Sequence, residues 1–180
     1  MSLPAQNAGF TLIELMIVMV VVAIFVTVGV PNFQNMISDN RLSTQANSLV
    51  SSLQLARSEA LKLGTPVSVC RTTNGTACAG VGTSWESGWL VFVDANASGG
   101  LDGGERIILS NGGLSGGNTL RAAAPFNNFI SYLPNGLQSA ANGSFRLCNG
   151  NVPDVTQGRR VLVSPTGHVQ TLKGGFASCT

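Results

Sequence analysis

The sequence contains few charged residues and only one histidine. Charged residues make up 10% of the 180 positions and hydrophobic residues 44%, which excludes a disordered acidic or basic tail protein. The single histidine, His168, has no serine or cysteine nucleophile at a recognisable spacing, and the glycine pairs do not form a phosphate-binding G-x-x-x-x-G-K loop. We therefore expect no enzymatic activity and interpret His168 as an ordinary turn or strand residue.

Charge is nearly absent from residues 1–38, where Glu14 is the only charged side chain. Residues 10–30 form one apolar run, and its 21 residues would span about 30 Å as a helix, the thickness of a bilayer core. A secretory signal peptide would have a basic start, a shorter apolar run and a small-residue cleavage site. An ordinary membrane anchor remains an alternative, but a carboxylate inside an apolar span costs roughly 2.5 to 3.5 kcal/mol and is rarely found without a partner.

A motif at the start of the apolar run suggests what that partner is. The stretch Gly9-Phe10-Thr11-Leu12-Ile13-Glu14, followed by a long apolar helix with Pro31, closely resembles the class III signal of type IV pilins and type II secretion pseudopilins. The resemblance implies that a prepilin peptidase cuts after Gly9 and methylates the new amine of Phe10. It also implies that Glu14 neutralises the amino terminus of a neighbouring subunit during assembly. The chain departs from the family in its leader, because residues 1–8 contain no Lys or Arg.

Beyond Pro31 the sequence becomes amphipathic and predicts a helix that packs one face on a core. Its apolar residues recur at spacings of three and four. They are Leu42, Ala46, Leu49, Leu53, Ala56, Ala60 and Leu63. Gly64 and Pro66 are expected to end the helix, as a C-cap glycine and a residue that cannot continue it. Gly29 and Pro31 predict a kink or a melted turn in what would otherwise be one rod over residues 10–63.

Short apolar runs alternate with turn residues after Pro66 and predict eight strands. The expected strands are residues 67–71, 89–94, 106–110, 119–123, 129–133, 145–149, 160–164 and 169–173. Asn-Gly and Gly-Gly pairs between them are typical of hairpin turns. The fold class is therefore α+β, with a long N-terminal helix laid against antiparallel sheets.

The predicted head also resembles the GspH/FimT-type branch of the pilin superfamily. The resemblance lies in LQLARSEA at residues 53–60, GWLVFVD at 88–94 and SPTG at 164–167. It implies the type IV pilin fold. The expected organisation is a leader peptide at residues 1–9, the transmembrane and assembly half of the helix at 10–31, its amphipathic half at 32–64, and a β-rich periplasmic head at 65–180.

All four cysteines lie in the head. An even number of cysteines in an exported domain favours disulfides, whereas zinc would need paired short spacings and more than one histidine. Three pairings are possible. The local pairing, Cys70 with Cys78 and Cys148 with Cys179, fits a strand-flanked loop and a C-terminus that is tied down.

One loop has the residue order of a calcium site. Asp94, Asn96, Ser98, Asp102 and Glu105 follow the pattern of an EF-hand loop, in which oxygen ligands at alternate positions and a terminal Glu surround Ca²⁺. The flanking residues predict strands, not helices. A solvated hairpin loop built from turn-forming residues explains the same residues, and we favour that interpretation.

Charge within the head is uneven. Residues 39–105 carry four basic and six acidic side chains, and residues 106–180 carry six basic and one acidic. Arg146, Arg159, Arg160 and Lys173 could form a basic face that attracts DNA phosphates. Some FimT-type pilins bind DNA through a C-terminal Gly-Arg-x-Arg element, but the matching residues here, GHVQ at 167–170, contain neither arginine. We favour a solvated basic surface or a subunit interface.

The resemblance thus implies a minor pilin or pseudopilin that primes or caps a type IV pilus or a type II secretion pseudopilus. It would cross the bacterial inner membrane once, with a periplasmic head, and then join the tip of the assembly. Its expected partners are other major and minor pilins or pseudopilins and the prepilin peptidase, and no cofactor is expected. A DNA receptor for natural transformation is the alternative.

Overall fold

The computed structural model describes residues 9–82, 84–150 and 153–179. The chain forms two compact units, which divide between Asp39 and Asn40. Most of the predicted leader, residues 1–8, lies outside the described residues. Nine elements follow one another in the described parts of the chain, one helix and eight strands.

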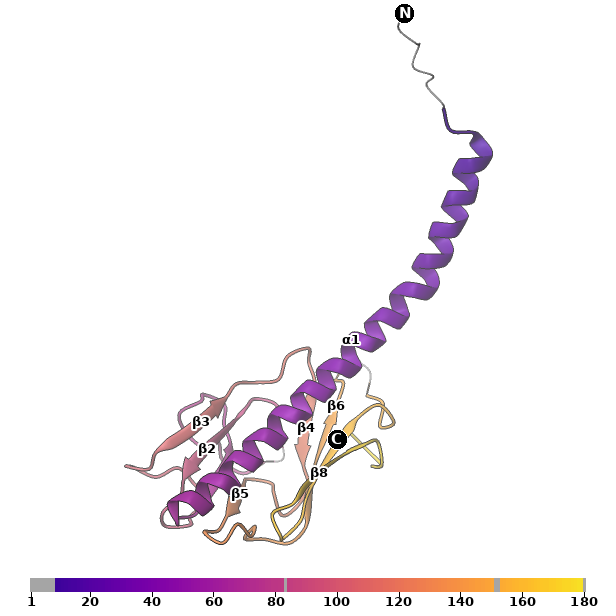
Figure 1. The fold of residues 1–180 in the computed structure, drawn as a ribbon. Coiled ribbons are helices and arrows are strands. Elements are labelled where there is room, and N and C mark those ends of the chain that lie inside the picture. The colour runs from indigo at the N-terminus through magenta and orange to yellow at the C-terminus, as the bar shows by residue number, and fades with distance from the viewer. Residues whose placement is uncertain (1–8, 83, 151–152, 180) are drawn as a thin grey trace, which may run out of the picture. The chain divides into compact units, whose positions relative to one another are not determined.

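The first unit contains the beginning of helix α1 (Leu12–Leu63), which is drawn in indigo to purple in Figure 1. The helix continues through Gly29 and Pro31, so the predicted alternative of a melted turn is wrong. Proline removes one backbone donor, and one turn earlier the Thr27 hydroxyl donates to the carbonyl oxygen of Ala23 at 2.9 Å. Side chains along this part of α1 are exposed wherever the structure describes them up to Met36.

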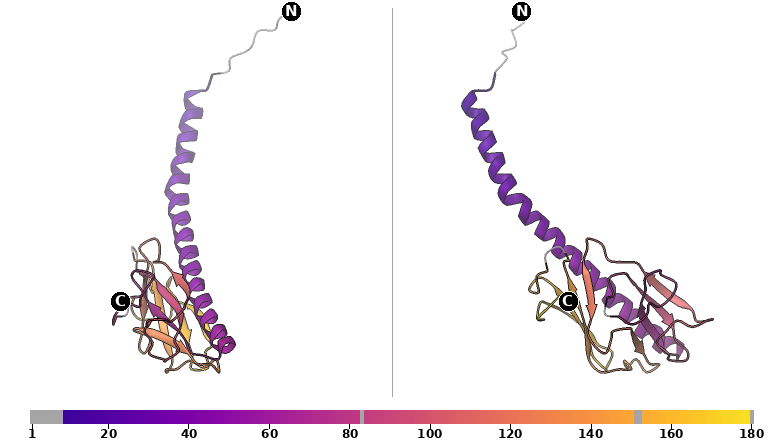
Figure 2. Two further views of the ribbon diagram at one scale, coloured as in Figure 1. Left: turned by 90° about the vertical axis from the view of Figure 1, so that its left-hand side faces the viewer. Right: turned by 180° about the vertical axis from the view of Figure 1, so that it is seen from behind.

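The second unit packs the remainder of α1 against two four-stranded antiparallel sheets (Figures 1 and 2). The first sheet has the order β3-β2-β1-β5 and the second the order β4-β6-β7-β8. The strands are β1 (Val67–Arg71), β2 (Trp89–Val93), β3 (Ile107–Asn111), β4 (Thr119–Ala122), β5 (Phe129–Tyr132), β6 (Gly143–Cys148), β7 (Arg159–Val163) and β8 (Val169–Lys173). The α+β prediction is confirmed, and each predicted strand overlaps an observed one with ends that differ by no more than two residues.

The core lies between α1 and the inner faces of both sheets. Leu42, Ala46, Leu49, Leu53, Ala56 and Ala60 are each 1% exposed or less, which confirms the predicted stripe up to Ala60. Leu63 does not belong to the stripe, because it is the last helical residue and is 38% exposed. Gly64 follows with a φ of +64° and donates its amide to the carbonyl oxygen of Ala60, the arrangement expected of a C-cap glycine.

Aromatic side chains fill the centre of this core. The rings of Trp85 and Phe145 meet edge to face with centroids 5.0 Å apart, and the rings of Phe126 and Phe145 stack at 5.8 Å. A second, smaller cluster of Cys70, Leu90 and Phe92 covers the opposite face of the first sheet. The central strands β1 and β2 of the first sheet are therefore buried on both faces.

Candidate assembly site and head surface

The first turn of α1 is organised by Thr11. The amide of Glu14 donates to the Thr11 hydroxyl oxygen at 3.3 Å, and the amide of Leu15 donates to the Thr11 carbonyl oxygen at 3.2 Å. Thr11 and Glu14 have the spacing of a capping box, in which the helix start satisfies its own backbone donors. The motif residues thus fix where the helix begins, two positions after Phe10.

Glu14 lies on the surface of the first unit among exposed apolar side chains. Phe10 is 83% exposed, and the neighbours Ile13 and Ile17 are 63% and 58% exposed. Among the described residues, the Glu14 carboxylate has no hydrogen-bond or ion-pair partner. The structure therefore presents an unpaired charge on an otherwise apolar surface, next to the proposed new amino terminus.

Helix α1 is long and apolar enough to cross a membrane. Length and composition alone do not separate such a helix from the core helix of a soluble protein. The exposure of α1 does separate it from a core helix, because none of its most apolar stretch is buried in the described structure. This surface needs either lipid or other protein around it.

The residues of the predicted calcium loop hydrogen-bond mainly to one another. Asp94 is fully buried, and it accepts the Ser68 hydroxyl at 2.5 Å and the amides of Ser98 and Gly99 at 2.9 and 3.0 Å. The Glu105 carboxylate accepts the amides of Ala95 and Asp102 at 3.0 and 2.9 Å. Both carboxylates therefore hold the hairpin loop together.

Asp102 has the same role. Asn96 and Ser98 donate side-chain hydrogen bonds to its Oδ2, each at 2.9 Å. Within the described residues, no group of three or more His, Cys, Asp or Glu side chains is placed to hold a metal ion. These hydrogen bonds account for the conformation of the hairpin loop, and calcium binding stays a prediction.

Among the described residues of the head, three side chains have shifted pKa values, and local surroundings explain each. Hydrogen bonds from Asn96 and Ser98 lower the pKa of Asp102, and hydrogen bonds from Thr156 lower the pKa of Asp154. Burial raises the pKa of Tyr132 above its usual range. Because folding lowers the pKa of both carboxyl groups, they favour the folded state above their ordinary pKa and lose that effect as the pH falls through the folded value.

Both disulfides of the local pairing are present. Cys70 bonds to Cys78 and Cys148 bonds to Cys179, and no cysteine is free. The first closes the loop after β1. The second attaches the C-terminal segment to the end of β6.

The four basic residues of the predicted DNA face do not share one surface. Arg146 pairs with Arg160 across β6 and β7, whereas Arg159 pairs with the core residue Leu147. Paired residues in a sheet point to the same face and consecutive residues to opposite faces. Arg159 is accordingly 8% exposed and donates to the Ser43 hydroxyl oxygen of α1 at 3.0 Å. The predicted basic face is wrong for Arg159, and also for Lys173, which pairs with Arg159 and lies on its side of the sheet.

Arg146 and Arg160 hold the C-terminal segment on the outer face of the second sheet. Arg146 donates to the carbonyl oxygen of Ser178 at 3.0 Å, and Arg160 donates to that of Gly175 at 3.1 Å. The disulfide of Cys179 fixes the same segment. These two arginines thus have a structural role.

Arg57 joins two of the head motifs, a role that sequence reasoning missed. It donates from Nε to the carbonyl oxygen of Gly136 and from Nη2 to that of Thr166, both at 3.0 Å. Gly167 packs beside it with a φ of +77°, and a Cβ there would collide with the Gly136 carbonyl. LQLARSEA on α1 and SPTG after β7 therefore meet through Arg57. The available signal in the sequence was the position of Arg57, a charged residue directly beside the apolar stripe of the helix.

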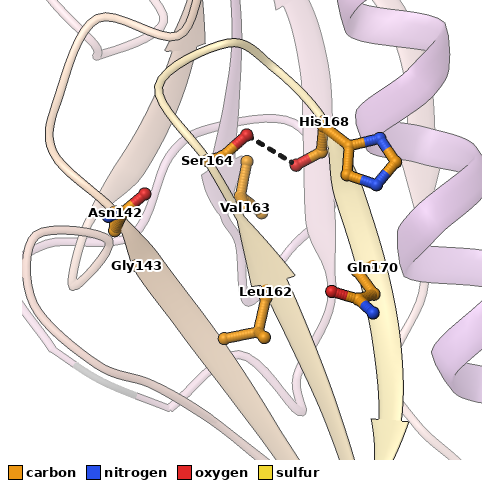
Figure 3. A pocket seen from close by; sticks show the side chains of 7 residues that line it. All are labelled: Asn142, Gly143, Leu162, Val163, Ser164, His168 and Gln170. Carbon is orange, nitrogen blue, oxygen red and sulfur yellow. Dashed lines mark hydrogen bonds between the residues drawn. The ribbon is translucent and has the colours of Figure 1, made fainter.

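A shallow groove lies on the outer face of the second sheet, beside the start of β8. Its volume is about 330 Å³, and Figure 3 shows the lining side chains. They are Asn142, Gly143, Leu162, Val163, Ser164, His168 and Gln170. His168 is exposed, and its carbonyl oxygen accepts the amide of Ser164 at 3.0 Å. It lies at the hairpin between β7 and β8, as expected of a turn or strand residue.

Comparison with known proteins gives two family matches. Residues 45–167 match the family described as type II transport protein GspH. Residues 4–30 match the prokaryotic N-terminal methylation motif. No curated protein matches the chain in sequence.

Solved structures with a similar fold are minor pilins and pseudopilins. The type IV minor pilin FimU of Pseudomonas aeruginosa is 21% identical with a TM-score of 0.63, over 78% of this chain and 96% of that one. The minor pseudopilin EpsH of the Vibrio cholerae type II secretion system is 14% identical with a TM-score of 0.53, over 76% of this chain and 99% of that one. The chain therefore has the type IV pilin fold.

Proposed function

The chain belongs to the type II transport protein GspH family, and we propose that it is a minor subunit that primes or caps a type IV pilus or a type II secretion pseudopilus. Members of this family are structural subunits, not enzymes. The N-terminal methylation motif and the apolar helix α1 fit anchoring in the inner membrane with the head on the periplasmic side. After assembly, the subunit would lie at the tip.

The observation that carries this proposal is the exposed Glu14 in the first turn of an exposed apolar helix. When such helices bundle in the membrane, an unpaired carboxylate becomes costly. A prepilin peptidase that cuts after Gly9 would create an ammonium group on Phe10. Pairing between Glu14 of one subunit and this amine of a neighbour would satisfy both charges, and their attraction is strong where water is excluded.

We assign the choice of neighbours to the head, because Glu14 and the apolar helix offer the same contacts to any subunit with this motif. The head has its own charge distribution and its own disulfide-tied surfaces. A minor subunit needs such individual surfaces in order to occupy one position in an assembly. Other pilins or pseudopilins are therefore the proposed partners.

The alternative, a DNA receptor, has weaker support in the head. Arg159 is buried, and Arg146 and Arg160 each bind a backbone carbonyl of the C-terminal segment. Arg121 lies opposite Arg146 in the pairing of β4 with β6, and it forms an ion pair with Glu86. Few guanidinium groups thus remain to neutralise phosphates, and non-specific DNA affinity depends on that number.

Co-purification of the full-length chain from membranes tests the two functions against each other. We expect mass spectrometry to identify other pilins or pseudopilins in the complex, and we expect the purified chain to give no salt-sensitive shift of duplex DNA at physiological ionic strength. The variant Arg121→Ala with Arg160→Ala serves as the control for any shift observed. A shift that this variant abolishes, without pilin partners in the complex, would favour the receptor.

A further inference from the structure

Within the described residues of the head, three of the four sheet edges are protected against further strand pairing. The edge of β4 is covered by residues 84 and 85, since Trp85 donates its amide to the carbonyl oxygen of Leu120. The edge of β5 is covered in the same way, since Ser139 donates its amide to the carbonyl oxygen of Ser131. The edge strand β3 has a register shift in its pairing with β2, and such irregularities are a common protection of edges.

The fourth edge, that of β8, has none of these protections. All five residues of β8 pair in regular register with β7, and no bulge interrupts them. In the part of the chain that the structure describes, no strand or bridge pairs with the other side of β8. Thr171, Leu172 and Lys173 are exposed. An exposed regular edge is a ready template for an additional strand.

The hydrogen bonds at the two ends of β8 fix which backbone groups point outward. The amide of Ser164 donates to the carbonyl of His168, and the amide of Gly174 donates to the carbonyl of Gly158. Hydrogen-bonded pairs alternate along an antiparallel ladder. Gln170 and Leu172 therefore bond to β7.

The backbone groups of the alternate residues of β8 point away from β7. Val169 and Thr171 each present an N–H and a C=O on the open side of β8. Both residues belong to non-hydrogen-bonded pairs, with Val163 and Val161 respectively. A strand added at this edge would bond to them without disturbing the pairing of β7 and β8.

The side chains around this edge indicate what kind of strand fits. The groove lined by Leu162 and Gln170 adjoins β8 on its outer face (Figure 3). Lys173 lies at the far end of β8 on the other face, where its positive charge also acts on Asp154. An opposite charge directly across a strand pair is stabilising and a like charge is not.

We propose that the open edge of β8 is the site where an extended segment of a neighbouring pilin subunit adds as a fifth strand to the second sheet. This segment carries an apolar side chain level with Gln170, which enters the groove, and a carboxylate level with Lys173. Backbone hydrogen bonds to Val169 and Thr171 hold it, as in other cases of strand addition. The inference rests on the proposed function, because it assumes that pilin subunits are the partners.

Two measurements on the full-length chain in its membrane complex test the proposal. A photo-crosslinking residue in place of Thr171 is expected to react with another pilin, whereas the same residue in place of Ile107 on the protected β3 edge is not. The amide hydrogen of Thr171 is expected to exchange at least about tenfold more slowly in the complex than in the isolated chain. The amide of Leu172 serves as the internal control, since β7 already protects it.

A proline substitution tests the backbone directly. Thr171→Pro removes an outward N–H and leaves the β7 ladder intact, so we expect at least about fivefold less incorporation with unchanged melting and intact disulfides. Thr171→Ala keeps the N–H and should incorporate normally. Equal incorporation of the two variants, or unchanged exchange of Thr171 on assembly, overturns the proposal, as does a crosslink to a second copy of this chain. If Thr171→Pro does not fold, the exchange rate of the Thr171 amide hydrogen in the unmodified chain tests the proposal instead.

If the unmodified chain does not incorporate into any pilus or pseudopilus, the proposed function itself fails.

Discussion

Replacing Glu14 with Ala is expected to leave the chain in the membrane but to reduce its incorporation into a pilus or pseudopilus about 100-fold. Removing one partner of a buried charge pair costs roughly 3 kcal/mol or more, because the other charge stays buried and unpaired. Membrane insertion is not reduced, because an apolar side chain in the span has a lower free-energy cost of insertion than a carboxylate. Quantitative immunoblots of sheared pili or pseudopili, and of the membrane fraction, measure the two effects separately.

Two control variants sharpen this test. Glu14→Asp keeps the charge and should retain most of the incorporation. Glu59→Ala removes a half-buried carboxylate in the head that pairs at 3.1 Å with the largely exposed Lys62, and ion pairs with an exposed partner contribute little. It should incorporate normally. Incorporation of Glu14→Ala at the level of Glu59→Ala would contradict the pairing of Glu14 with a neighbouring amine.

Removing the disulfide of the C-terminal segment is expected to have the second-largest effect. Cys148 and Cys179 are 31 positions apart, and the chain-entropy model gives about 3 to 4 kcal/mol for a loop of that length. The double variant Cys148→Ala with Cys179→Ala should therefore lower the free energy of unfolding of the purified chain by about this amount. It should also weaken the contacts of Arg146 and Arg160 with the segment, because the disulfide no longer holds it in place.

The other disulfide is the matched control. Cys70 and Cys78 are only 8 positions apart, so the same model gives about 2.5 kcal/mol for the corresponding double variant. Denaturant unfolding of both double variants in the same detergent measures which of them loses more free energy of unfolding. A larger loss for Cys70→Ala with Cys78→Ala than for the C-terminal pair would refute the ranking.

Local sequence signals predicted the elements well, because each depends on near neighbours. The spacing of Leu42 to Ala60 along one helical face and the glycine at position 64 placed the buried part of α1 and its end. Asn-Gly and Gly-Gly turns separated the strands to within two residues. The local pairing of the cysteines followed from the same strand positions.

The sheet order could not be predicted, since it depends on contacts between distant segments. Strand β1 pairs with β5 as well as β2, and β4 pairs with β6 in a separate sheet. The contact of Arg57 with Gly136 and Thr166 follows only from this topology. By contrast, the burial of Arg159 had a local signal. Two consecutive arginines in a strand must point to opposite faces, so Arg159 and Arg160 could not both belong to one basic surface.

We propose that this chain is cut after Gly9 and assembles through the new amine of Phe10 and the carboxylate of Glu14. Intact-mass and N-terminal analysis of the chain recovered from assembled pili or pseudopili tests it most directly. We predict that the assembled chain begins with Phe10 and that its amine is methylated. Assembled chain that still begins with Met1, or with any residue other than Phe10, would contradict the account.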